Sequence, residues 1–101
     1  MNDEEIKQLN QDIDNGKEAE RLIGNPLLMS IIYSRKVSAS ESFMTTAPND
    51  DKGRKEAWHK AQAAIALEGD LQQIVEQGKI AKKLLDEQDR FTQTNNNPLG
   101  E

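Results

Sequence analysis

An unbroken helical register from about residue 50 to residue 91 constrains this fold more than any other feature. The stretch contains no proline. Small or apolar residues recur along it at alternating steps of three and four: Ala64, Leu67, Leu71, Ile74, Gly78, Ala81 and Leu85. Such steps form a heptad seam, which packs against other helices. The sequence therefore predicts one long helix whose seam carries helix packing or contacts between copies.

Composition favours a small protein that completes its core by association. The chain has 101 residues, which corresponds to at most one small domain. Apolar residues make up 35% of it and charged residues 31%, so a monomer would bury only a thin core. Helix pairing, oligomerisation or docking onto a larger assembly would relieve this shortage, and we expect an oligomer.

Several classes of site are excluded or disfavoured by residue content. The chain has no cysteine and a single histidine, His59, so we expect no metal site and no cofactor. The acidic N-terminus does not resemble a signal peptide, and no apolar run reaches the ~18–20 residues that span a bilayer. Residues 1–24 hold seven acids against three bases, which disfavours general affinity for nucleic acid.

Capping signals divide the chain into three predicted helices. Asn2, with Glu5 three residues on, begins a helix over residues 3–23 that ends at Gly24. The Asn25-Pro26 pair starts a second helix over residues 26–46. Asn49 or Asp50 caps the third, over about 50–91. These helices form one predicted domain, 1–91, and the polar residues 92–101 are expected to be a flexible tail.

The predicted fold class is all-α, as a helical hairpin or a three-helix arrangement with one long C-terminal helix. The second helix is about half as long as the third, so a hairpin alone leaves half of the seam bare. Either the first helix or a second copy of the chain would cover that half. The expected hairpin core consists of Leu28, Ile32, Phe43 and Trp58.

A basic cluster near the start of the third helix is the one candidate binding patch. Lys52, Arg54, Lys55 and Lys60 surround Trp58 and His59 and could meet phosphate or an acidic partner. Interleaved acids favour the simpler interpretation that these bases are solvated and that Trp58 anchors the hairpin. His59 has no placed nucleophile beside it, and no glycine-rich phosphate loop occurs, so we expect no enzyme and no small-molecule substrate.

Three segments carry a resemblance. They are Ala19-Glu20-Arg21-Leu22-Ile23-Gly24-Asn25-Pro26-Leu27, then Gly53-Arg54-Lys55-Glu56-Ala57-Trp58, then Leu71 through Gly78-Lys79-Ile80-Ala81. Together they resemble small uncharacterised helical proteins encoded among the structural and packaging genes of tailed bacteriophages. The resemblance covers residues 17–85 and departs at the serine-rich residues 37–42. Its motifs serve helix packing, and it brings no active site with it.

The resemblance implies a non-enzymatic bacteriophage structural or assembly protein that acts through helix–helix docking. Its partners would be further copies of itself or other phage or host proteins, in the host cytoplasm or within the virion. One alternative is an acidic helical regulator or inhibitor that binds a basic host protein. Another is a DNA-packaging accessory that contacts nucleic acid.

Overall fold

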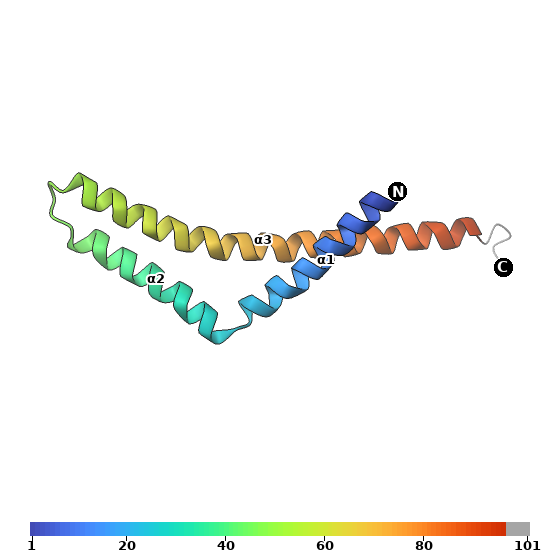
Figure 1. The fold of residues 1–101 in the computed structure, drawn as a ribbon, viewed down its shortest axis with the longest axis horizontal. Coiled ribbons are helices and arrows are strands. Elements are labelled where there is room, and N and C mark those ends of the chain that lie inside the picture. The colour runs from blue at the N-terminus through green and yellow to red at the C-terminus, as the bar shows by residue number, and fades with distance from the viewer. Residues whose placement is uncertain (97–101) are drawn as a thin grey trace. The chain divides into compact units, whose positions relative to one another are not determined.

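The structure is all-α, with one long C-terminal helix, as the sequence predicts. The computed structural model describes the backbone of residues 1–96 and the side chains of residues 1–91. Three helices follow one another: α1 (Asp3–Ile23), α2 (Pro26–Thr45) and α3 (Asp51–Asn96) (Figure 1). Residues 1–96 contain no β-strand.

Each helix begins at a residue whose side chain accepts from the first backbone amides. Asn2 Oδ1 accepts from the Glu5 N–H at 2.8 Å. Asn25 Oδ1 accepts from the amides of Leu27 and Leu28, while Pro26 occupies the first turn. Asp50 Oδ1 accepts from the Gly53 N–H at 2.9 Å. Because the first amides of a helix have no partner within it, these bonds fix where the helices start.

The long helix α3 extends further than the sequence indicates. It continues through residues 92–96, which belong to the expected flexible tail. None of these five residues is glycine or proline, so nothing in them interrupts the backbone hydrogen bonds of the helix. The remaining part of the predicted tail, residues 97–101, lies outside the described residues.

Contacts within the chain gather into two compact units. The hairpin unit comprises residues 21–72, and therefore α2 with the N-terminal half of α3. The crossing unit comprises residues 1–20 together with the C-terminal half of α3 from residue 73 onward. The continuous helix α3 thus contributes a packing face to each unit.

In the hairpin unit, α2 runs antiparallel along α3 (Figure 1). Ile32 and Ala39 of α2 are buried, as are Ala57 and Ala64 of α3. Both pairs are seven residues apart, which keeps each pair on one helix face. Lys36 and Glu68 form an ion pair at 2.6 Å at the edge of this contact, with both side chains about two-thirds buried.

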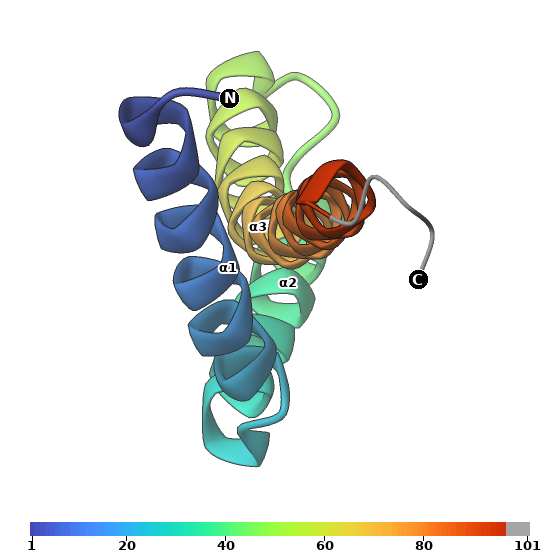
Figure 2. The same cartoon turned by 90° about the vertical axis from the view of Figure 1, so that its right-hand side faces the viewer.

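In the crossing unit, α1 passes obliquely over the C-terminal half of α3 (Figures 1 and 2). Gly16 and Ala19 are the buried residues of α1. Gly78 and Ala81 are the buried residues on the other side of the contact, and Ala81 is only 1% exposed. Ile74 and Leu85 of the predicted seam are half-buried here, as is Leu71 in the hairpin unit.

Small residues dominate the buried positions. The buried apolar residues are Ile32 and five alanines, and no large side chain among residues 1–91 is fully buried. Small interface residues allow helix axes to approach closely, so packing rests on backbone contact more than on bulky side chains. No helix within residues 1–96 combines the length and the hydrophobicity needed to cross a membrane.

Two neighbouring isoleucines test the hairpin packing. Ile32 is 2% exposed, whereas Ile31 is half exposed. Ile32→Ala should lower the free energy of unfolding by about 2–5 kcal/mol, since it removes buried methyl groups and leaves a cavity. Ile31→Ala should change it by less than about 1 kcal/mol. Urea denaturation of both variants measures the difference, and equal losses would contradict the assigned face of α2.

Candidate interaction surfaces

The first surface is the contact between Gly16 of α1 and Gly78 of α3. A Cβ atom built on Gly16 would lie 2.9 Å from Gly78 Cα, and one built on Gly78 would lie 2.9 Å from both Gly16 Cα and the Asp12 carbonyl oxygen. Cβ atoms do not approach backbone atoms so closely without a shift in the structure. The two helices therefore meet backbone to backbone, which only glycine permits at both positions.

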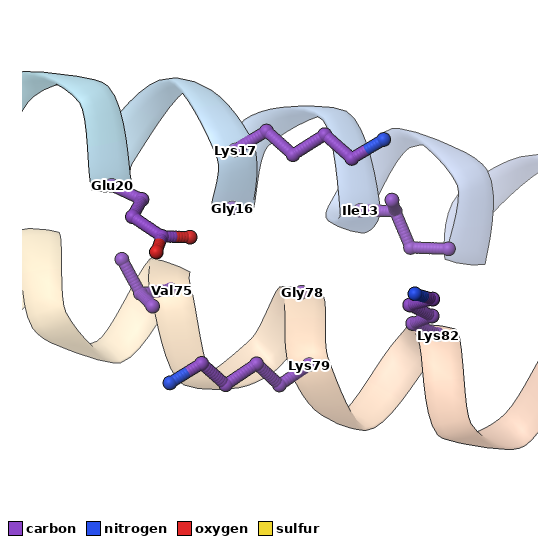
Figure 3. Close-up of a pocket in the computed structure, with 8 residues that line it drawn as sticks. All are labelled: Ile13, Gly16, Lys17, Glu20, Val75, Gly78, Lys79 and Lys82. Atoms are coloured by element: carbon purple, nitrogen blue, oxygen red, sulfur yellow. The ribbon is translucent and has the colours of Figure 1, made fainter.

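A small hollow opens beside this crossing (Figure 3). Its walls are formed by Ile13, Gly16, Lys17, Glu20, Val75, Gly78, Lys79 and Lys82. Lys79 pairs with Glu76 at 3.5 Å, and the lysines that line the hollow are all exposed to solvent. We interpret this hollow as the gap that two glycines leave between helices rather than as a ligand site.

The second surface is an aromatic groove on the hairpin unit. Phe43 of α2 and Trp58 of α3 line two adjoining hollows together. We define the aromatic groove by these two residues and their neighbours in the hollows: Ala39, Ser40, Asp51, Arg54, Lys55, Ala57 and Ala61. Arg54 donates to Asp51, and Lys55 leaves this end of the groove with a net charge of +1. Exposed aromatic rings over an alanine floor are typical of surfaces that bind other proteins.

The expected hairpin core differs from the observed one at its two aromatic residues. Ile32 is buried and Leu28 is half-buried, but Phe43 is 47% exposed and Trp58 is 52% exposed. The central position at this level belongs to Ala57, which is buried. The adjacent Trp58 is turned about 100° around the helix from Ala57, so its ring lies on the flank of the contact.

The predicted seam and basic patch are also divided among different surfaces. Within the seam, Ala64, Gly78 and Ala81 are buried, whereas Leu67 is 49% exposed and its neighbour Glu68 pairs with Lys36 of α2. Within the patch, Arg54 and Lys55 line the aromatic groove, and Lys60 lines a different groove. Lys52 is exposed and lines none of these hollows.

His59, the one histidine of the chain, lies on the surface of α3. The His59 ring makes an edge-on contact with Trp58, with ring centroids 5.1 Å apart, and is exposed. No group of three or more histidine, aspartate or glutamate residues in the described part of the chain is placed to hold a metal ion.

The sequence did not predict the Lys36–Glu68 ion pair, nor the grooves on the two sides of the contact between α2 and α3. The two partners are 32 residues apart, so no local spacing rule connects them. The antiparallel hairpin brings them level, and only the register of α2 against α3 determines that.

Comparison with known proteins gave no match to this chain. No protein-family model, no curated protein and no solved structure matches the chain.

Two glycines of α3 test the backbone contact at the crossing. Gly78→Ala should lower the free energy of unfolding by about 1–3 kcal/mol, because the new methyl group meets backbone atoms of α1 that must move. A Cβ atom on Gly69 would meet no neighbouring atom within 4 Å, so Gly69→Ala should raise stability by up to about 1 kcal/mol through helix propensity alone. Chemical denaturation followed by circular dichroism measures both.

The test depends on whether the free energy of unfolding falls with Gly78→Ala and rises with Gly69→Ala. Both variants should keep their helical signal at low denaturant, since alanine favours helix at either position. A Gly78→Ala variant as stable as Gly69→Ala would show that α1 does not touch α3 at this point.

Proposed function

We propose that this chain is a non-enzymatic structural or assembly protein that acts by helix docking. The resemblance to small proteins encoded among tailed-bacteriophage structural and packaging genes favours a role in the assembly of the phage particle. Its place of action would then be the host cytoplasm or the virion. The aromatic groove is the surface that we assign to docking, and a second copy of the chain is the partner that we assign to it.

The distribution of apolar side chains is the observation that carries this proposal. Among residues 1–91, alanine and glycine fill most buried positions, while twelve large apolar side chains are at least 42% exposed. The exposed set is Met1, Leu27, Ile31, Tyr33, Phe43, Met44, Trp58, Ile65, Leu67, Ile80, Leu84 and Phe91. Contiguous exposed apolar surface marks interaction sites, and Phe43 and Trp58 share one such surface across two helices.

Charge supports a second copy as the occupant of the aromatic groove. Like charges that meet across an interface oppose association. Arg54 is already paired with Asp51 at this surface, so the groove lining carries a net charge of only +1, from Lys55, and two copies would meet with little repulsion. Such a contact would bury the two aromatic rings of each copy, the residue type that contributes most to binding.

The acidity of α1 supports a second candidate function. Residues 1–20 hold seven acidic and two basic side chains, and all the acidic ones except Asp12 are exposed. An acidic regulator that docks this helix on a basic protein would show binding that weakens steeply with salt. A DNA-packaging accessory is less well supported, because Arg54 is paired and the four bases of the predicted patch do not share one surface.

Self-docking can be followed with the single tryptophan of the chain. Light scattering over a concentration series should give masses that rise above 11.4 kDa, and the Trp58 emission should shift to shorter wavelength as the ring leaves water. Phe43→Ala should weaken association by on the order of tenfold, because it removes an aromatic anchor and keeps the reporter.

Tyr33→Ala provides the matched control. Tyr33 is an exposed aromatic residue of α2 outside the aromatic groove, so its loss should leave association unchanged. A mass of 11.4 kDa at every concentration, with constant emission, would contradict docking between copies. Equal weakening by Tyr33→Ala would contradict the assignment of the groove.

A further inference from the structure

A second groove lies on the other side of the contact between α2 and α3. It is lined by Arg35, Ser38, Ala39, Ser42, Lys60, Ala63, Ala64 and Leu67, and its volume is about 410 Å³. We call it the cationic groove. It shares only Ala39 with the aromatic groove, and no acidic side chain of the described residues lines it.

Both cations of this groove lack a partner within the described part of the chain. Arg35 and Lys60 are exposed and make no ion pair or hydrogen bond with residues 1–91, whereas Lys36 and Arg54 nearby are both paired. Two unpaired cations beside an apolar floor favour a partner that carries negative charge and an apolar stripe.

The dimensions of the groove fit one face of a helix. Lys60 and Leu67 lie two helical turns apart, about 10 Å along α3. In the antiparallel register marked by the Lys36–Glu68 ion pair, Arg35 lies about level with Gly69, just past Leu67, so the two cations stand near opposite ends of the groove. Alanines on the floor between them leave room for a backbone to approach. A helix with carboxylates seven residues apart would reach both cations.

Acidic residues beyond the groove limit the length of such a partner. Glu56 lies one turn before Lys60 on α3, and Asp70 lies about one turn after Leu67. Carboxylates of a partner that extended past the groove would meet these acids and be repelled. A second copy docked through the same face would set Arg35 and Lys60 against their own counterparts, which disfavours self-association here.

We propose that the cationic groove binds a short acidic helical segment of another protein, with two carboxylates seven residues apart on Arg35 and Lys60 and apolar or small residues between them. This inference rests on the proposed docking function and adds the chemistry of a partner to it. The serines Ser38 and Ser42 line the wall of α2 and offer hydroxyl groups to the same partner. The mode of binding is that of a helix in a groove.

Nuclear magnetic resonance titration of the full chain with a defined probe tests this inference. The probe is a 15-residue alanine-rich peptide, stapled into a helix on its far face, with two glutamates seven residues apart around a leucine. The matched peptide has glutamine at both positions. We expect the glutamate peptide to bind about tenfold tighter at low salt, with amide shifts concentrated at Ala39, Ala63 and Leu67.

Charge-matched variants separate the groove from general electrostatics. Arg35→Gln with Lys60→Gln should abolish the preference for glutamate, while Lys52→Gln with Lys83→Gln, which removes the same charge at exposed positions outside both grooves, should keep it. Equal losses in both pairs, or no difference between the two peptides, would overturn the proposal. A short DNA duplex that binds more tightly than the peptide and depends on Arg35 and Lys60 would also overturn it.

Light scattering on the same variants keeps the two proposals apart. Neutralising Arg35 and Lys60 should leave the mass measured by light scattering unchanged, because self-docking is assigned to the aromatic groove. A mass that changes with these two residues would mean that the cationic groove contacts another copy, which would overturn its assignment to a foreign partner. If the chain binds the peptide but does not self-associate, the cationic groove proposal is supported and the proposed contact between copies is wrong.

Discussion

Backbone contact between Gly16 and Gly78 is the constraint on which the crossing unit depends. A Cβ atom on either residue would lie 2.9 Å from a backbone atom of the facing helix, so the helices can meet at this distance only where both side chains are hydrogen atoms. Ala19 and Ala81, each close by in sequence, are buried with them. Because so little side-chain volume separates the helices, α1 covers the C-terminal part of the seam within one chain.

Small side chains also form the helix contact of the hairpin unit, and the larger side chains at the sides of that contact stay exposed. Ala39 is buried with Ala57 and Ala64, so the larger neighbours of these alanines lie at the sides of the contact. On one side, Phe43 and Trp58 form an aromatic groove whose lining carries one ion pair and one further cation, Lys55. On the other, two unpaired cations stand over alanines. One hairpin thus offers two surfaces with different chemistry, one suited to copies of the chain and one to an acidic partner.

Local signals in the sequence predict where each helix begins, but they do not predict which face of the helix is buried. The caps at Asn2, Asn25 and Asp50 act through neighbours two or three residues away, so spacing alone locates each start. Helix faces depend on contacts distant in sequence. Trp58 looks like a core residue from its hydrophobicity, but the register of α2 gives the central place to Ala57. The heptad spacing likewise assigns Leu67 to the seam, whereas in the structure Leu67 is half exposed and its neighbour Glu68 contacts α2 through Lys36.

The most direct test of this account is the nuclear Overhauser effect between the Hα atoms of Gly16 and Gly78. A uniformly labelled sample should show a strong cross-peak, because the two backbones are in contact. A mixture of labelled and unlabelled chains, filtered for contacts between copies, should not show it. A cross-peak that is missing from the first sample, or present in the second, would contradict a crossing formed by α1 and α3 of the same chain.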